Sequence, residues 1–355
     1  MTLEHFGYND NIEKLRIQHH LMDFEIGRII SEHKERYIVA TENGDFEAEI
    51  TGNLRYTANT REDFPAVGDW VAVSEYDDNK VLLHFIVPRK TIIQRQAVGK
   101  QGERQIIATN IDFAFIVQAV DRDFNINRIE RYLTICNTSH IQPIILLNKI
   151  DLISETILDD LLLKVKERVA KVPIIAISNT TQKGIDSVTA YIEKGKTYCL
   201  LGSSGVGKSS LLNNLSGKQQ MKTNAVSTST NKGRHITTHR ALIALENGGV
   251  VIDNPGMREV GIADAVEGLE KTFEKILTLS QNCRFKNCTH TIEIDCAVME
   301  AVESGKVDKL YYENYLKIKR ENEHFELTVA EKRKKEKDFG KTYKQFKNFK
   351  KSNKY

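Results

Sequence analysis

The stretch CLLGSSGVGKSSLL at residues 199–212 joins an apolar run to a glycine-rich turn and the opening of a helical pattern. It contains the sequence G-x-x-x-x-G-K-S, a turn that directs backbone N–H groups toward phosphate oxygens at a helix N-terminus. The helix dipole favours negative charge at the same point. We therefore predict a phosphate-binding loop, and its contact residues are Gly202, Ser203, Ser204, Gly205, Val206, Gly207, Lys208, Ser209 and Ser210.

A second motif, IILLNKIDL, predicts which base the nucleotide carries. Its polar residues directly follow an apolar run that is typical of a buried strand. In α/β sheets, ligands bind at the edge formed by the carboxyl ends of the parallel strands. The Asp151 carboxylate can accept two hydrogen bonds from the N1–H and the exocyclic amine of guanine, a donor pair that adenine lacks. The residues expected at the guanine are Asn148, Lys149 and Asp151, with Ser178 and Asn179 of AISNTT near its O6.

Two later segments supply the expected magnesium and γ-phosphate contacts. In VVIDNPGM, Asp253 ends an apolar strand and is expected to hold Mg²⁺ through water, while the Gly256 N–H senses the γ-phosphate. In KGRHITTHR, a hydroxyl of Thr237 or Thr238 is expected to bind Mg²⁺ only when the γ-phosphate is present, as an ordered switch loop does. We assign Thr238 and Ser209 as the magnesium ligands.

The order of these motifs along the chain differs from that of Ras-like GTPases. Here the two base-contacting motifs precede the phosphate loop, whereas Ras-like chains begin with the phosphate loop and end with the base-contacting motifs. Joining old termini that lie close together and opening a surface loop gives such an order without disturbing the core. The sequence therefore predicts a circularly permuted domain whose last strand leads directly into the C-terminal segment.

The residues that would catalyse hydrolysis are only partly indicated. Lys208 is expected to neutralise phosphate oxygens, but Met257 stands where Ras-like enzymes place a water-orienting glutamine, so slow intrinsic hydrolysis is expected. His235, beside the magnesium-binding Thr238, is our candidate for orienting water, and His239 is its rival. Both histidines could equally be solvated or contact RNA.

The segment CRFKNCTHTIEIDC offers Cys283, Cys288, His290 and Cys296 in the spacing C-x4-C-x-H-x5-C. Three thiolates and one imidazole complete a tetrahedral Zn²⁺ site with no position for a substrate water, which indicates a structural metal. The alternative is a set of buried free cysteines beside an incidental histidine. With five cysteines in 355 residues, a reducing compartment is expected, and the cytoplasm is the default.

Composition and patterning define the rest of the chain. Short apolar runs separated by turns predict a small β-barrel, most economically an OB-fold, that binds RNA or is merely structural. No run approaches the roughly 18 apolar residues of a membrane span, and no signal peptide is visible. The expected parts are an N-terminal extension (1–25), the OB-fold (26–100), a permuted α/β P-loop GTPase domain (101–275), a mostly helical zinc-binding domain (276–328) and a tail (329–355).

Charge is distributed unevenly. Residues 331–355 carry eleven Lys/Arg and three acidic residues, whereas the whole chain has a formal net charge of only +3. A basic tail of this kind can bind a polyanion. It can equally be a solvated segment that keeps the protein soluble.

Taken together, the motifs resemble the circularly permuted ribosome-assembly GTPases of the RsgA (YjeQ) type. The resemblance rests on VGDWV, PRK, NIDFAFIV, NKIDL, GSSGVGKSSLLN, GRHITTHR, DNPGMRE and the cysteine motif, in that order. It implies GTP hydrolysis to GDP and phosphate, stimulated by the small ribosomal subunit during its late maturation, with rRNA as partner and zinc in the C-terminal domain. We expect a monomer. The alternative is a GTP-gated rRNA-binding switch or chaperone with negligible turnover.

This sequence departs from the family pattern at three places. The family commonly has Thr where Asn254 and Ile236 stand, and E-P-G-C where this chain has EIDC. None of these changes removes an expected ligand.

Overall fold

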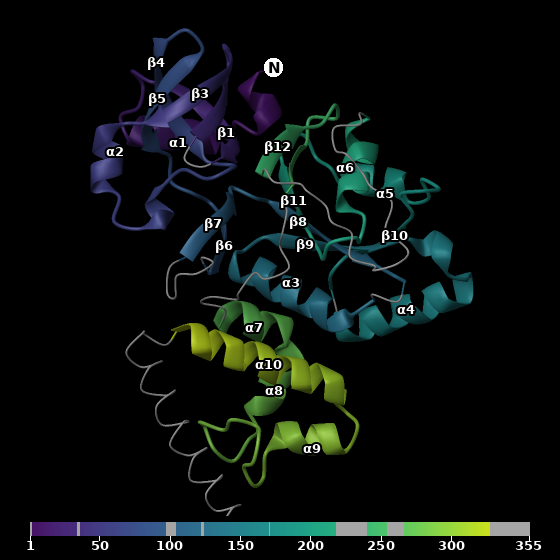
Figure 1. The fold of residues 1–355 in the computed structure, drawn as a ribbon. Coiled ribbons are helices and arrows are strands. Elements are labelled where there is room, and N and C mark those ends of the chain that lie inside the picture. The colour runs from purple at the N-terminus through teal and green to yellow at the C-terminus, as the bar shows by residue number, and fades with distance from the viewer. Residues whose placement is uncertain are drawn as a thin grey trace, which may run out of the picture.

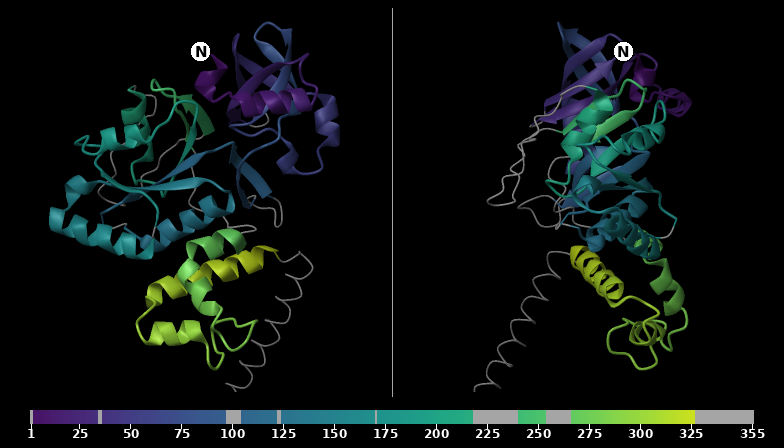
Figure 2. Two further views of the ribbon diagram at one scale, coloured as in Figure 1. Left: turned by 180° about the vertical axis from the view of Figure 1, so that it is seen from behind. Right: turned by 90° about the vertical axis from the view of Figure 1, so that its right-hand side faces the viewer.

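The computed structural model describes residues 2–33, 36–96, 104–121, 124–169, 171–217, 240–253 and 266–326. A β-barrel lies at one end, a small helical domain at the other, and a domain built on a parallel sheet between them (Figure 1; Figure 2). The predictions on His235, Thr238, Gly256 and the tail 329–355 fall outside the described residues.

The barrel consists of five strands: β1 (Glu25–His33), β2 (Arg36–Thr41), β3 (Gly44–Ile50), β4 (Trp70–Asp77) and β5 (Lys80–Ile86). The strands pair in the order β1-β2-β3-β5-β4, and a β1–β4 pairing closes the barrel. Only β3 and β5 run parallel to each other. This closed five-stranded barrel confirms the OB-fold prediction. Helix α2 (Gly52–Thr57) and the short 3-10 helix η2 (Arg61–Asp63) connect β3 to β4.

The segment before the barrel packs onto it. It contains the 3-10 helix η1 (Leu3–Phe6) and helix α1 (Asp10–Gln18), and Leu3, Phe6 and Leu21 are buried in the same core as the barrel strands. Asn9 caps α1 by accepting hydrogen bonds from two N–H groups of its first turn. The apolar residues of this segment therefore extend the barrel core.

The middle domain is a doubly wound α/β sheet, as predicted. Its strands are β8 (Phe113–Ala119), β9 (Gln142–Asn148), β10 (Ile174–Ile177), β11 (Thr197–Leu201), β12 (Arg240–Ala244) and β13 (Val250–Asp253), in the order β10-β9-β8-β11-β13-β12. Its helices are α3 (Ile126–Thr138), α4 (Glu155–Arg168), α5 (Ile185–Ala190) and α6 (Lys208–Ser216). All pairings are parallel except that of β12 with β13.

Helices cover both faces of this sheet, which explains why its strands read as continuous apolar runs. In β8, Ile116 belongs to the core shared with α3, whereas Phe115 and Val117 belong to the core shared with α5 and α6. Cys136 of α3 and Cys199 of β11 are fully buried in the first of these cores.

The barrel and the middle domain share one sheet. A hairpin joins β12 to β13, with Gly248 at φ +85° in its turn. On its other side, β12 pairs with β1 through Ser31↔Ala241 and Glu32↔Arg240, so the strand order runs on into the barrel. A two-stranded ribbon of β6 (Ile92–Gln96) and β7 (Arg104–Thr109) also links the two domains.

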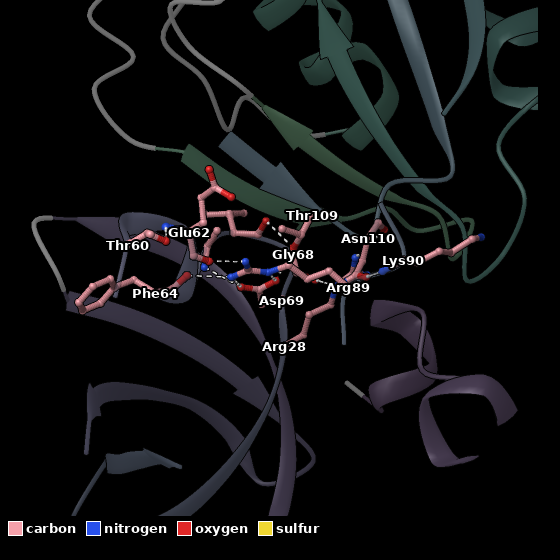
Figure 3. A network of polar contacts seen from close by, with 12 residues as sticks. Arg28, Thr60, Glu62, Phe64, Gly68, Asp69, Arg89, Lys90, Thr109 and Asn110 are labelled. Atoms are coloured by element: carbon pink, nitrogen blue, oxygen red, sulfur yellow. Dashed lines mark hydrogen bonds and ion pairs between the residues drawn. The ribbon is translucent and has the colours of Figure 1, made fainter. Parts of the chain in front are cut away.

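A buried arginine lies at this junction (Figure 3). Arg28 of β1 is 1% exposed and donates to the carbonyl oxygens of Phe6, Gly68 (3.2 Å) and Asn110 (3.3 Å) and to the hydroxyl of Thr197 (2.9 Å). Burial lowers its pKa to about 10, so it stays charged at neutral pH. Its contacts join the N-terminal segment, the barrel, the interdomain linker and the start of β11.

An ion pair, Arg89 with Asp69, lies beside Arg28. Asp69 accepts two hydrogen bonds from Arg89, at 2.8 and 2.7 Å, and one from the hydroxyl of Thr109 at 2.7 Å. Arg89 also donates to the carbonyl oxygens of Glu62 and Phe64. The VGDWV and PRK motifs thus meet at the junction, because they contain Asp69 and Arg89.

The C-terminal domain consists of helices α7 (Val266–Thr272), α8 (Glu274–Ser280), α9 (Ala297–Glu303) and α10 (Lys309–Glu326) around the cysteine segment. Helix α7 packs closely on α3, since a Cβ at Gly268 would lie 2.1 Å from the Thr138 hydroxyl. None of the helices in the described ranges has the length and apolar character needed to cross a membrane.

Side-chain contacts hold α10 against the middle domain. The buried carboxylate of Glu130 accepts from Arg168 at 2.7 and 2.8 Å and from the Asn314 amide at 2.6 Å. A half-buried pair, Arg131 with Glu321, lies one residue further along α3. These contacts connect α3 and α4 to α10.

Candidate nucleotide-binding and metal sites

The predicted phosphate loop lies between β11 and α6. Gly202, Gly205 and Gly207 all have positive φ, at +149°, +83° and +99°, a region that glycine enters without steric cost. At Gly202 a Cβ would also lie 2.4 Å from the Val117 carbonyl oxygen. The Lys208 ammonium donates to the carbonyl oxygens of Gly202 (2.8 Å) and Ser203 (2.7 Å), so it sits across the loop where phosphate oxygens are expected.

The two predicted base-contacting segments come together at the ends of β9 and β10. Asp151, in the 3-10 helix η3 (Ile150–Leu152), is exposed and accepts a 2.5 Å hydrogen bond from the Ser178 hydroxyl. The same hydroxyl accepts from the Thr181 N–H at 3.0 Å. This contact fixes one carboxylate oxygen of Asp151 and thereby orients the group that we expect to face guanine.

Both base-contacting segments are bonded to the phosphate loop. The Asn148 amide, 1% exposed, donates to the Val206 carbonyl at 2.7 Å, and the Asn179 amide donates to the Gly207 carbonyl at 2.9 Å. The two asparagines also meet each other, since the Asn179 N–H donates to Asn148 Oδ1 at 3.3 Å. Residues near 148, 179 and 207 therefore form one connected unit.

The parallel sheet explains why these motifs meet whatever their order in the chain. Strands β9, β10, β11 and β13 run in the same direction, so the residues at their carboxyl ends share one edge. Asp253 ends β13, is 2% exposed, and is the register partner of Leu200 in β11, which places it beside the phosphate loop.

Two residues of this site were not predicted from the sequence. Asp121 follows β8 at the same edge and binds the Lys149 ammonium at 2.8 Å. A carboxylate directly after a parallel strand was the signal that could have revealed it. Asn214 of α6 donates to Asn179, and nothing in the helical pattern around it distinguishes it from a surface residue.

The four predicted metal ligands converge in the C-terminal domain. Their ligand atoms all lie within 4.8 Å of one another. Cys283 Sγ and Cys296 Sγ are 3.9 Å apart, and His290 Nδ1 lies 3.6 and 3.5 Å from them. A tetrahedral zinc, with bonds of about 2.3 Å to sulfur and about 2.0 Å to nitrogen, separates its ligand atoms by about 3.5 to 3.8 Å. The cluster, completed by Cys288, therefore fits a tetrahedral metal ion.

The loop that carries these ligands is held by its own polar contacts. The Glu293 carboxylate accepts from the Thr289 hydroxyl, the Thr289 N–H and the Thr291 N–H, and these bonds hold its pKa well below the usual range. The Tyr312 hydroxyl of α10 donates to the His290 carbonyl. His290 adopts φ +62°, which makes the sharp turn that brings it back toward Cys288.

Comparison with known proteins agrees with this arrangement. The family model described as RsgA GTPase matches residues 86–263. The chain belongs to this family. A second model, described as 50S ribosome-binding GTPase, matches residues 197–332. That match begins at the strand before the phosphate loop and omits the base-contacting motifs, as a permuted order requires.

Similar proteins extend over nearly the whole chain. It is 40% identical over 342 residues to "Small ribosomal subunit biogenesis GTPase RsgA 1" of Bacteroides thetaiotaomicron, covering 96% of this chain and 95% of that protein. It is 44% identical over 296 residues to the RsgA 2 protein of Lactiplantibacillus plantarum, covering 83% of each.

Solved structures with the same fold include YjeQ from Thermotoga maritima, with TM-score 0.61, 25% identity, and coverage of 83% of this chain and 96% of that one. YloQ, described as a circularly permuted GTPase, has TM-score 0.59 and 26% identity, with coverage of 88% and 99%. These matches confirm the predicted family, the permuted domain and the GTPase activity. The roles of individual site residues remain predictions.

Proposed function

We propose that this protein binds the small ribosomal subunit, assists its late maturation and hydrolyses GTP to GDP and phosphate with subunit-stimulated turnover. The relatives that match over most of the chain carry the name of a small ribosomal subunit biogenesis GTPase. The observation that carries the nucleotide assignment is the hydrogen-bonded unit of Asp151, Ser178 and the phosphate loop. It combines a carboxylate for guanine with a cradle for phosphates.

In this proposal each part of the site has one role. Asp151 accepts hydrogen bonds from guanine, Lys208 neutralises β- and γ-phosphate oxygens, and the Gly256 N–H responds to the γ-phosphate. The magnesium ligands are Ser209 and Thr238. Bound Mg²⁺ supplies charge neutralisation on the phosphates. Asp253 would hold this ion through water, and His235 remains the candidate that orients the attacking water.

We also propose that the Cys₃His cluster binds one structural Zn²⁺ per chain. All four ligands come from the protein, so a tetrahedral ion has no position left for a reacting water. The metal then stabilises the C-terminal domain and takes no part in hydrolysis. Metal analysis of gently purified protein should find about one zinc per chain, and a content well below that contradicts the assignment.

The proposed partner on the subunit is rRNA. The barrel has the five-stranded OB architecture, whose strand face and loops bind oligonucleotides in other proteins. The Lys-rich tail adds a charge that attracts phosphate. We propose that the protein acts as a monomer in the cytoplasm, where it meets maturing subunits.

The decisive experiment measures GTP hydrolysis with and without purified small subunits. Stimulated turnover supports the GTPase proposal, whereas nucleotide-dependent binding without stimulation indicates a switch with negligible turnover. Asp151→Asn serves as the specificity control, because its amide can donate to the C2 carbonyl of xanthine. This variant should lose affinity for GTP and gain affinity for xanthosine triphosphate. Unchanged preference for GTP overturns the guanine assignment.

A further inference from the structure

Asn214 links the helix behind the phosphate loop to the base-contacting segment. It lies on α6, six residues after Lys208, and its amide Nδ2 is 3.2 Å from both the carbonyl oxygen and the side-chain Oδ1 of Asn179. It is half-buried, and its side chain contacts no residue of the phosphate loop in the hydrogen bonds that the described residues show. The side chain therefore ties α6, which continues directly from the loop, to Asn179.

Asn179 is itself bonded to both the phosphate loop and the segment that carries Asn148. Its own amide donates to the Gly207 carbonyl at 2.9 Å, and its N–H donates to Asn148 at 3.3 Å. Its chain neighbour Ser178 holds Asp151 at 2.5 Å. A shift of Asn179 would therefore move both the oxygen that receives guanine and the carbonyl at the start of α6.

The packing at Gly207 leaves little room for these segments to move independently. A Cβ at this glycine would lie 2.3 Å from the Asn148 amide nitrogen and 2.8 Å from that of Asn179. The two amides thus fill the space against the phosphate loop. Asn214 closes this unit from the side of α6.

We propose that Asn214 is a positioning residue for guanine selectivity: it fixes where Asp151 stands relative to the phosphate loop. This inference rests on the proposed role of Asp151. Phosphate contacts anchor one end of the nucleotide, so the base meets Asp151 in register only if the two segments keep a fixed separation. Loss of that separation weakens hydrogen bonds to the base and leaves phosphate binding in place.

The test compares GDP with IDP, whose base lacks the exocyclic amine that Asp151 is expected to read. Asn214→Leu has similar volume and no donor. It should weaken GDP binding about five- to tenfold, the value of roughly one hydrogen bond. The affinity for IDP should fall less, so the ratio of the dissociation constant for IDP to that for GDP should decrease. Asn214→Asp keeps the shape and faces two oxygens of Asn179 with a carboxylate, so it should act in the same direction.

Gln182→Ala is the matched control. Gln182 also donates to the Asn179 carbonyl, at 2.8 Å, but it belongs to the same turn and does not reach α6. Its removal should leave the GDP/IDP ratio unchanged. Because Asn214 acts through Asn179, the double variant of Asn214→Leu with Asn179→Ala should be no worse than the more severe single variant.

Equal losses of GDP and IDP affinity in both Asn214 variants would show a merely structural contact and overturn the proposal, as would an unchanged GDP affinity. Thermal unfolding of each variant identifies global destabilisation. The separate Asp151→Asn experiment distinguishes the two levels of inference. If that variant keeps its preference for GTP, the guanine assignment has failed. If the Asp151→Asn variant gains affinity for xanthosine triphosphate while Asn214→Leu leaves the GDP/IDP ratio unchanged, only the positioning role of Asn214 has failed.

Discussion

The two interdomain junctions each contain an arginine, but they are built differently: Arg28 is buried, whereas Arg168 is only partly buried and contacts a buried carboxylate. At the junction with the barrel, the hydrogen-bond acceptors of Arg28 in the described part of the chain are neutral carbonyl and hydroxyl oxygens, and Asp112 and Asp69 act on it only through their charge. At the junction with the C-terminal domain, Arg168 pairs directly with the buried carboxylate of Glu130.

Their surroundings differ in the same way. Around Arg28 the chain itself crosses the junction, because β1 pairs with β12 and the acceptors belong to the backbone of three segments. Around Arg168 the junction consists of side chains from helices that pack against one another. We therefore expect the barrel to unfold together with the GTPase domain, and the C-terminal domain to detach when a few side-chain contacts are lost.

The largest effect is expected at Arg28. Arg28→Met leaves the Phe6 and Asn110 carbonyls and the Thr197 hydroxyl without this donor at the junction. The loss should be about 3–5 kcal/mol, because each buried acceptor that is left unsatisfied costs about 1–3 kcal/mol. Denaturant unfolding, followed by the fluorescence of Trp70 in the barrel and by GDP release from the GTPase domain, should then show two separate transitions.

Arg28→Lys is the control for charge without the planar fork of donors, since one ammonium cannot reach all four oxygens. Its free energy of unfolding should lie between those of wild type and Arg28→Met. Coincident transitions in Arg28→Met, with a loss below about 1 kcal/mol, would contradict the idea that this arginine joins the two domains.

Arg168→Leu should have a smaller and more local effect. It removes the cation from Glu130, and the pKa of that carboxyl then rises further because burial is no longer opposed. The expected loss is about 3 kcal/mol. Hydrogen exchange should show reduced protection in α10, while β1 and β8 keep theirs. Equal loss of protection in β8 would mean that the two junctions are not independent.

The stability of the junction with the C-terminal domain should depend on pH through Glu130. Burial raises the pKa of Glu130 from 4.5 to about 7, although Arg168 opposes the shift. Below pH 4.5 the carboxyl is protonated in both states, so its contribution to stability is fully present. Between pH 4.5 and 7 the unfolded chain releases the proton while the folded chain keeps it, so that contribution is lost as pH rises through the folded pKa.

Glu130→Gln removes this dependence. At about 1.4 kcal/mol per pKa unit, the free energy of unfolding of wild type relative to the variant should fall by up to about 3 kcal/mol across the window. The readout is the thermal midpoint of the C-terminal domain at a series of pH values. Parallel pH profiles of the two proteins would show that Glu130 does not titrate in this range.

The burial of Arg28 and Glu130 could not be predicted from the sequence. Apolar runs and fixed-spacing motifs predicted the parallel strands and the phosphate loop, because each of those signals is local. Arg28 and Glu130 look like surface residues in the sequence, since charged side chains are rarely buried without a partner. Their partners lie far along the chain, at Thr197 and Arg168, and only the fold brings them together.

The same reasoning covers the candidate site. The motifs predict Asp151 and Ser178 at the same guanine, since each follows a strand and the carboxyl ends of parallel strands share an edge. Asn214 was missed because a helix interior gives no comparable rule for where a polar side chain points. Its function depends on its distance to Asn179, and that distance follows from how α6 packs on the sheet.

The smallest effect is expected from the pair of Arg131 with Glu321, which lies beside the Glu130 cluster but at the surface. Its distances of 2.7 and 2.5 Å are as short as those of the buried pair, yet both side chains are about a quarter to a third exposed. Solvent screens such a pair and both long side chains lose freedom in forming it, so Glu321→Gln should cost less than about 1 kcal/mol. Added salt should shrink this cost further, whereas the cost of Arg168→Leu should barely change. A loss from Glu321→Gln as large as that from Arg168→Leu, measured by the same hydrogen exchange at α10, would show that geometry rather than burial determines the strength of this junction.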